Sequence, residues 1–413
     1  MTLSEDLTWR GLIKDKTFDD AAWINEAKTF YWGVDCSSDS LTVGNLAPLM
    51  LAKRLSLAGW KAVLLVGGAT SLIGDPGGKD AERPLLPREE VEKNVAAIKA
   101  QVSGLFEGQE FQLVDNYDWF KDVGYLDFLR DVGKHFPMSE LIQREFIAER
   151  MGEDGGGISY AEFSYSLIQG YDFWQLFKNQ GTVLQIGGSD QWGNMLSGVA
   201  LIRKKESAEA NALSMPLVVN KETGKKFGKS EDAAIWLDPA KTTATEFYQF
   251  WINTDDADVE EYLKFFTLLT REEIERVMAE QQADPGQRAA QKKLAEEVTK
   301  LVHGDSSESA EGVTKYLTSQ VSIGEASDEE LEKIRHEIPS VLAGPGAAVV
   351  AILVNAKLAS SNSDARRLLA AKAVYINGQQ IQKENFEESD FQNGRLLLRR
   401  GKAFKDSALV ELN

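Results

Sequence analysis

The chain has 413 residues, a formal net charge of −18 and 43% hydrophobic residues. This length is enough for two or three domains, and the acidic balance argues against a generally basic nucleic-acid coat or a membrane-surface protein. A local RNA-binding patch on an acidic body stays open. Cys36 is the only cysteine, so no internal disulfide can form and a reducing compartment fits best. Because no apolar run approaches signal-peptide or membrane-spanning length, we expect a soluble cytoplasmic protein.

A short polar helix region is expected over residues 9–28. The stretch from Phe30 to Asn45, FYWGVDCSSDSLTVGN, then predicts a strand, a polar loop and the start of a helix. Aromatic and β-branched residues favour the strand, and the serines and aspartates after it break the pattern. Gly44 at the helix start would let a phosphate approach backbone N–H groups that have no intrahelical partner. The alternative is an ordinary strand–loop–helix connection without a ligand.

Two further apolar runs, AVLLVGG over 62–68 and TVLQIGG over 182–188, read as buried strands that end in paired glycines. A helix over 91–102 and a strand over 111–116 continue the alternation. Alternating strands and helices predict an α/β fold with a doubly wound parallel sheet, whose ligands bind beyond the carboxyl ends of the strands. The loop after residue 68 is rich in Gly and Pro and is either a mobile lid or an ordinary connection.

The region 138–179 is expected to be largely helical. Within FSYSLIQGYDFW, Tyr165, Gln169 and Asp172 are spaced by four and three residues, which places them on one helical face. Such a face either lines a polar pocket or forms a solvent-facing stripe. A second open choice concerns the basic loop KETGKKFGKS, in which Lys226 and Lys229 either swing onto a phosphate chain or belong to a solvated turn.

Beyond the first 233 residues, which form the expected α/β domain, helical patterns dominate over 234–338. Residues 339–348 read as a linker. The last segment, 349–413, predicts two short helices, a turn at Asn377-Gly378 and a strand pair with a basic tip. From Ser361 onward it holds nine Lys and Arg residues against seven Asp and Glu residues. This module is therefore the place where RNA phosphates would bind.

Five segments in order carry a specific resemblance: GGATSLIGDPGGKDAER, FSYSLIQGYDF, LQIGGSDQWGN, KFGKS and FYQFWINT. Together they resemble the bacterial-type tyrosyl-tRNA synthetases, which are class I aminoacyl-tRNA synthetases, over nearly the whole chain. The resemblance implies a Rossmann-like catalytic domain, a helical anticodon-binding domain and a C-terminal module of the ribosomal small-subunit-protein type. It also implies a cytoplasmic homodimer that binds tyrosine tRNA, tyrosine and ATP. Mg²⁺ would accompany ATP, with no metal site on the chain itself.

The resemblance also implies a role for each matched residue. The tyrosine carboxylate would attack the α-phosphate of ATP, and transfer to the terminal ribose of the tRNA would follow. The catalytic positions are Lys226, Lys229, Thr42, Asn45, Lys79 and Arg83. The tyrosine-binding positions are Tyr31 and Asp172 for the phenol, Asp75, Tyr165 and Gln169 for the ammonium, and Gln191 near the carboxylate. The ATP-binding positions are Gly33, Asp35, Ser37, Gly44, Gly188, Asp190 and Lys229.

One departure from the family pattern stands in the tetrad Thr42-Val43-Gly44-Asn45. The family has histidine at the first and last positions. Asn45 can still donate a hydrogen bond, but the shorter Thr42 side chain offers only one neutral donor. Losing one transition-state donor costs about 10²–10³ in rate. Either the loop is rearranged, a water fills the gap, or the enzyme is slow.

Two functions therefore stay in view. The first is a working tyrosine–tRNA ligase, supported by the matched pocket residues and both KFGKS lysines. The second is a paralogue that binds RNA without aminoacylation or activates tyrosine for a different acceptor, and Thr42 motivates it. A tyrosine-dependent ATP–pyrophosphate exchange assay and complementation in cells separate the two.

Overall fold

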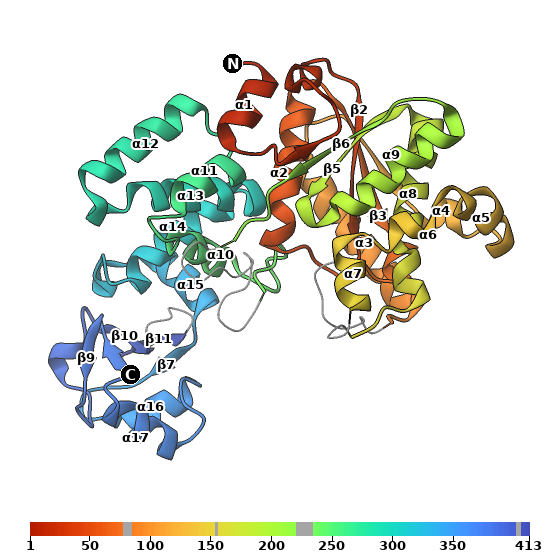
Figure 1. Ribbon diagram of the computed structural model, residues 1–413. Helices are drawn as coiled ribbons and strands as arrows, with labels where there is room; N and C mark the ends of the chain where they lie inside the picture. Colours follow the sequence, from red (N-terminus) through yellow and green to blue (C-terminus); the bar gives the residue numbers. More distant parts are fainter. Residues whose placement is uncertain (77–84, 153–155, 220–233, 402–405) are drawn as a thin grey trace. The chain divides into compact units, whose positions relative to one another are not determined.

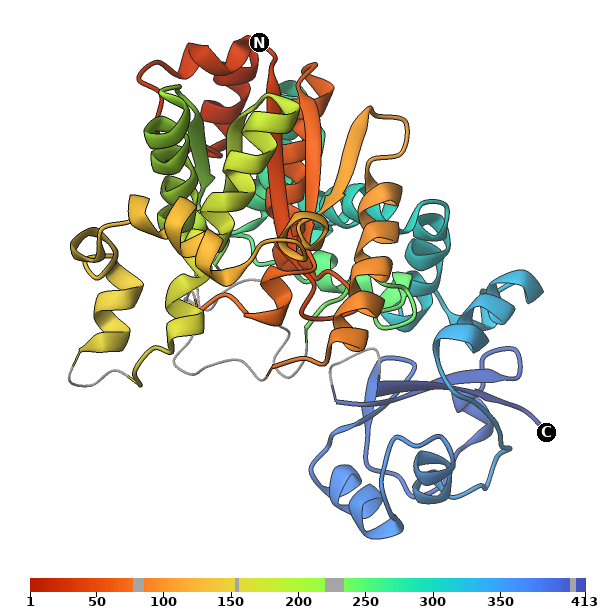
Figure 2. The same cartoon turned by 90° about the vertical axis from the view of Figure 1, so that its right-hand side faces the viewer.

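A computed structural model describes residues 1–76, 85–152, 156–219, 234–401 and 406–413 (Figures 1 and 2). By internal packing the chain divides into two compact units. The first comprises Met1–Asp238 and Thr254–Ala290, and the second comprises Pro239–Asn253 and Gln291–Asn413. The expected phosphate-binding residues Lys79, Arg83, Lys226 and Lys229 lie outside the described residues.

The first unit is built on a six-stranded sheet in the order β1-β6-β5-β2-β3-β4. Its strands are β1 (Asp15–Lys16), β2 (Thr29–Asp35), β3 (Lys61–Gly67), β4 (Phe111–Asp115), β5 (Thr182–Gly188) and β6 (Asn211–Met215). All neighbouring strands are parallel except β1 and β6. The predicted doubly wound parallel sheet is therefore confirmed. The strand order reverses at β2, where β3 lies on one side and β5 on the other, and such a switch point is where these sheets bind ligands.

Helices cover both faces of this sheet (Figure 2). α2 (Val43–Leu57) and α3 (Arg88–Leu105) lie on one face. α8 (Tyr160–Gln180) and α9 (Trp192–Glu206) lie on the other, where they pack against Tyr31, Val63 and Leu65 of the sheet. The remaining helices of the unit are α1 (Leu3–Arg10), α4 (Tyr117–Phe120), α5 (Tyr125–Asp131), α6 (Met138–Leu141), α7 (Glu145–Met151), α11 (Val259–Phe266) and α12 (Arg271–Ala283).

Local sequence explains where several helices begin and end. α1 starts with a capping box in which the Thr2 hydroxyl accepts from the Glu5 N–H and the Glu5 carboxylate accepts from the Thr2 N–H. α8 starts in the same way. Gly11, at φ 76°, ends α1 in the left-handed conformation that glycine adopts without strain. The helix expected over 9–28 is largely wrong, because α1 lies upstream and β1 and a 3-10 turn (Ala21–Asn25) follow it.

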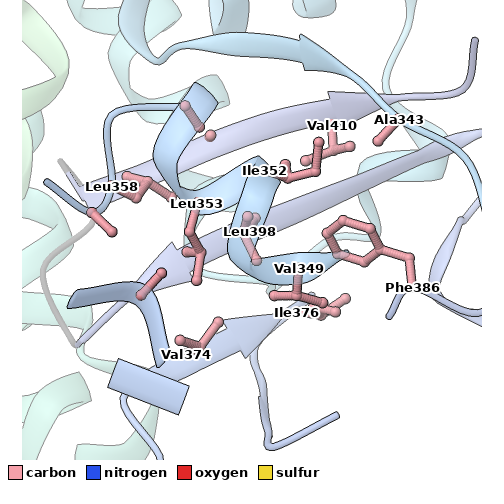
Figure 3. Packing of buried hydrophobic residues seen from close by; sticks show 14 of the residues in the cluster. Ala343, Val349, Ile352, Leu353, Leu358, Val374, Ile376, Phe386, Leu398 and Val410 are labelled. Atoms are coloured by element: carbon pink, nitrogen blue, oxygen red, sulfur yellow. The ribbon is translucent and has the colours of Figure 1, made fainter. Parts of the chain in front are cut away.

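The second unit combines helices with a five-stranded sheet in the order β7-β11-β10-β8-β9. Its helices are α10 (Ala244–Ile252), α13 (Ala289–His303, in this unit from Gln291), α14 (Ser306–Leu317), α15 (Asp328–Glu337), α16 (Val349–Asn355) and α17 (Asn362–Ala370). Its strands are β7 (Ser340–Leu342), β8 (Val374–Ile376), β9 (Gln379–Ile381), β10 (Arg395–Arg400) and β11 (Ser407–Glu411). Figure 3 shows how α16 packs Val349 and Leu353 against Leu398 of β10. The predicted turn joins β8 to β9, with φ of 48° at Asn377 and 81° at Gly378, as a type I′ hairpin requires.

α8 and α9 approach each other closely because glycines lie between them. A Cβ built on Gly198 of α9 would lie 2.6 Å from the Phe173 Cβ of α8. Gly193, also in α9, is different, since its Cβ would meet only the Arg144 Cδ at 3.8 Å. The contact at Gly198 therefore fixes the spacing of the helices that carry the residues described below.

We predict opposite effects for two glycine-to-alanine substitutions in α9. Gly198→Ala would overpack the α8–α9 contact and lower the free energy of unfolding by about 1–3 kcal/mol. Gly193→Ala would leave stability unchanged or raise it by up to about 1 kcal/mol through helix propensity. Urea unfolding followed by circular dichroism measures both. Equal effects of the two substitutions would contradict the close packing at Gly198.

Candidate active site

A cavity of about 350 Å³ lies at the carboxyl ends of β2, β5 and β6. The expected site residues that line it are Tyr31, Gly33, Asp35, Ser37, Gly44, Asn45, Asp75, Tyr165, Gln169, Asp172, Gly188, Asp190 and Gln191. The helical face of Tyr165, Gln169 and Asp172 therefore lines a pocket and is not a solvent-facing stripe. No Lys or Arg of the described residues lines the cavity.

Asp172 is a buried polar group of the cavity lining and is 2% exposed. The indole N–H of Trp119 donates to its Oδ1 at 2.9 Å, and the Asn116 amide donates to its Oδ2 at 3.1 Å. The Tyr31 hydroxyl is buried and has no hydrogen-bond partner among the described residues. Because a buried hydroxyl without a partner is costly, this end of the cavity is suited to a ligand that carries its own hydroxyl group.

Burial raises the pKa of Asp172 to about 8, although the hydrogen bonds from Asn116 and Trp119 oppose this shift. Burial, and after it the charge of Asp172, raises the pKa of Tyr31 well above its usual value. Both shifts favour the neutral forms of these groups. This end of the cavity is therefore suited to a polar group without charge, such as a phenol.

Carboxylates and amides surround the middle of the cavity. The Gln191 amide donates to Asp75 Oδ2 at 2.6 Å, and the Tyr165 hydroxyl donates to Asp35 Oδ2 at 2.9 Å. Burial, followed by the charge of Asp35, raises the pKa of Tyr165 well above its usual value, so its hydroxyl stays a donor. This set of acceptors without a lining cation is suited to a ligand ammonium group.

Backbone and small side chains line the opposite end of the cavity. Gly188 ends β5, and a Cβ there would lie 2.6 Å from Asp190 Oδ1, so a larger residue would collide with that carboxylate. Gly44 and Asn45 come from the first turn of α2, where the positive end of the helix dipole favours anions. This end is suited to a polar, negatively charged ligand such as a nucleotide.

Thr42 does not line the cavity. It is the N-cap residue of α2, and its hydroxyl donates to Asn45 Oδ1 at 3.1 Å. Lys79, Arg83, Lys226 and Lys229 lie outside the described residues, so their expected roles stay predictions.

Three residues that act at the cavity were missed by the sequence analysis. Asn116 and Trp119 hold Asp172 from positions 56 and 53 residues earlier in the chain. Asn116 directly follows β4, and the rule that polar residues at strand ends line sites could have identified it. Trp32 also lines the cavity, but its position inside a strand of aromatic residues reads as core.

Two family models match this chain. That of tRNA synthetases class I (W and Y) matches residues 25–316, and that of the Tyrosine--tRNA ligase SYY-like C-terminal domain matches residues 330–405. The chain is 45% identical to a tyrosine–tRNA ligase of Geobacillus kaustophilus over 92% of each chain. It is 42% identical to that of Anaeromyxobacter dehalogenans over 99% of each chain.

Solved structures agree with these matches. A C-terminally truncated mitochondrial tyrosyl-tRNA synthetase of Aspergillus nidulans superimposes with a TM-score of 0.68 at 33% identity, covering 75% of this chain and 92% of that one. A tryptophanyl-tRNA synthetase of Encephalitozoon cuniculi, at 16% identity and a TM-score of 0.53, shares the fold over 80% of this chain and 92% of its own. The chain belongs to the class I tRNA synthetases of the tryptophan and tyrosine family.

We predict that Asp172 makes stability fall as pH rises. Its folded pKa of about 8 lies above its unfolded value, so the folded state holds the extra proton between these two values. This group therefore lowers the free energy of unfolding by about 1.4 kcal/mol per pH unit as the pH rises from about 4 to 8. Its effect is constant above that range. Urea unfolding of the parent and of Asp172→Asn across this range measures the difference in slope. Parallel pH profiles would contradict the raised pKa.

Proposed function

We infer that the chain is a tyrosine–tRNA ligase, which activates tyrosine with ATP and transfers it to tRNA. Identity of 42% and 45% over nearly the full length of tyrosine–tRNA ligases supports this function. At the site itself, the cavity carries the proposal, because it ends in Asp172 and in a Tyr31 hydroxyl that has no hydrogen-bond partner among the described residues. A phenol gives the Tyr31 hydroxyl a partner and can also bond to Asp172, while phenylalanine leaves the Tyr31 hydroxyl unpaired. Tyrosyl-tRNA synthetases are themselves the standard example of this discrimination.

In the proposed reaction, a carboxylate oxygen of tyrosine forms a bond to the α-phosphorus of ATP. The bond from that phosphorus to the bridging oxygen breaks, and pyrophosphate leaves with the electron pair. No covalent enzyme intermediate forms, so the chain contributes positioning and charge stabilisation. The tyrosyl group then passes from the adenylate to a hydroxyl of the terminal ribose of the tRNA, releasing AMP.

The cavity supports an assignment for each substrate group. Asp75, Tyr165 and Gln169 would hold the ammonium, with Gln191 near the tyrosine carboxylate. Asp35, which accepts from Tyr165, would link the ammonium region to the nucleotide region.

The nucleotide assignments follow the shape of the opposite end. Gly33, Ser37, Gly44, Gly188 and Asp190 would contact the ribose and phosphates of ATP, which enters with its Mg²⁺ as substrate. Lys226 and Lys229, with Lys79 and Arg83, would supply the positive charge that the described lining lacks.

Tyrosine-dependent ATP–pyrophosphate exchange tests the function. We expect exchange with tyrosine and none with phenylalanine at equal concentration. Lys229→Ala would reduce the exchange rate by about 10²–10³, because one transition-state donor is lost. Lys61→Ala is the matched control, since Lys61 is exposed at the start of β3, away from the carboxyl ends. Absence of tyrosine-dependent exchange in the parent would overturn the function.

The second candidate is a paralogue that activates tyrosine for a different acceptor. The observation that favours it is that Thr42 does not line the cavity. Charging of tyrosine tRNA by the full chain separates the candidates. Exchange without charging would favour the second one.

The expected domains are 1–233, 234–338 and 349–413, with the linker 339–348 between the last two. We propose that the last of these binds tRNA. Exposed Arg366 on α17 and Lys372 just after its end offer cations for phosphates, while the neighbouring Arg367 pairs with Asp364 at 2.8 Å. No helix of the described residues is long and apolar enough to cross a membrane. We propose the cytoplasm as its location, where ATP and tRNA are both present.

We also propose that the chain forms a homodimer through the segment between β4 and α8. The exposed large apolar residues of this part of the chain are Tyr125, Leu126, Met138, Ile142, Met151 and Tyr160. Leu126 is 78% exposed, and a group of this kind on one segment is typical of a protein interface. Figure 1 shows the short helices α4, α5 and α6 beside α8.

We predict that Leu126→Asp weakens the dimer at least about tenfold, because it places a charge in an apolar contact. Light scattering after size-exclusion chromatography across a concentration series measures the mass. Leu57→Asp is the control, since Leu57 is 59% exposed at the end of α2. A parent that is monomeric at all concentrations, or equal masses for both variants, would contradict this interface.

A further inference from the structure

The first turn of α2 contains a hydrogen-bonded pair, Thr42 and Asn45. The Thr42 N–H donates to Asn45 Oδ1 at 3.0 Å, and the Thr42 hydroxyl donates to the same oxygen at 3.1 Å. Asn45 lines the cavity, whereas Thr42 does not. Asn45 therefore belongs to the cavity lining, and Thr42 contacts Asn45 from outside the cavity.

These two bonds determine which way the Asn45 amide faces. A backbone N–H can only donate, so the amide atom that faces Thr42 must be the oxygen. The Asn45 Nδ2 group then points away from the bonded oxygen, on the other side of Cγ, and it has no hydrogen-bond partner among the described residues. Since Asn45 lines the nucleotide end, the free part of its side chain is a donor.

The backbone of Thr42 is itself held in place. Its neighbours make two bonds to the segment at 235–237: the Val43 N–H donates to the Ile235 carbonyl at 3.0 Å, and the Leu237 N–H donates to the Leu41 carbonyl at 2.8 Å. Thr42 thus sits in a short antiparallel bridge with Trp236. A residue whose backbone is held on both sides can fix the orientation of a side chain that is hydrogen-bonded to it.

We propose that Thr42 is a positioning residue, which orients the Asn45 amide so that Nδ2 donates to the phosphates or ribose of ATP. This inference rests on the proposed ligase function. The family has histidine at this position, and a direct contact with phosphate was expected there. The proposal instead gives Thr42 an indirect role, through Asn45. The short side chain suits this role, because it reaches Asn45 and does not need to reach the nucleotide.

A double-mutant cycle in the full-length protein tests the proposal through tyrosine-dependent pyrophosphate exchange. Thr42→Val removes the hydroxyl at nearly equal volume and would lower kcat about 3–10-fold, the effect of one neutral hydrogen bond. Asn45→Ala removes the donor and would lower kcat about 10²-fold. The double variant would lie within about twofold of Asn45→Ala, because Thr42 acts only through that side chain. Thr42→Ser would retain the parent rate.

Two further measurements separate positioning from loss of structure. The KM for tyrosine would stay at the parent value in each variant that folds, and circular dichroism would show parent-like helix content despite a melting temperature lowered by loss of the N-cap bonds. Asn45→Asp keeps an acceptor for both Thr42 donors but loses Nδ2, so it would be at least as slow as Asn45→Ala. Multiplicative effects in the double variant, or a parent-like Asn45→Asp, would overturn the proposal. A parent without exchange would instead overturn the ligase function.

Discussion

The structure of the site depends on keeping one carboxyl group, that of Asp172, buried at the end of the cavity. A buried carboxyl is costly unless it is hydrogen-bonded or neutral. Here both remedies are present, because Asn116 and Trp119 each donate to one oxygen and burial raises the pKa of Asp172 to about 8. The donors come from the region directly after β4, so that region must pack on α8. This requirement ties the fold of the segment that follows β4 to the position of Asp172 in the cavity.

The remaining site geometry follows from two backbone periodicities. Alternation along β2 places Tyr31, Gly33 and Asp35 on one side of the sheet, and because the cavity lies at the end of the strand, Trp32 and Val34 from the other side line it too. Helical spacing along α8 brings Tyr165 and Asp172 to the same cavity from the other side. The close contact at Gly198 sets the distance between α8 and α9, which both contribute lining residues. Strand register, helix spacing and one close helix contact therefore build the pocket together.

This explains what could be predicted from the sequence. Apolar runs that end in glycine predicted the strands of the parallel sheet, and the spacing of Tyr165 and Asp172 indicated a polar face. Asn116 and Trp119 could not be paired with Asp172, because contacts across more than 50 residues leave no local pattern. α1 was missed although Thr2 and Glu5 form the Thr-x-x-Glu signature of a capping box, so the signal was present. The orientation of Asn45 depends on the backbone at 235–237, which no local motif reveals.

The two ends of the cavity differ in how they respond to pH. Imidazoles, which the family pattern has in the tetrad, titrate near neutrality, whereas the Asn45 amide keeps one protonation state across that range. His135, His303 and His336 do not line the described cavity. Among the described lining residues, Asp172 has its pKa raised toward neutrality, to about 8. A change of pH near neutrality therefore alters the charge of Asp172, whereas the Asn45 amide on α2 keeps its protonation state. The departure from histidine in the tetrad thus removes a titrating group from the start of α2 and leaves the pH response of the cavity to a buried carboxyl.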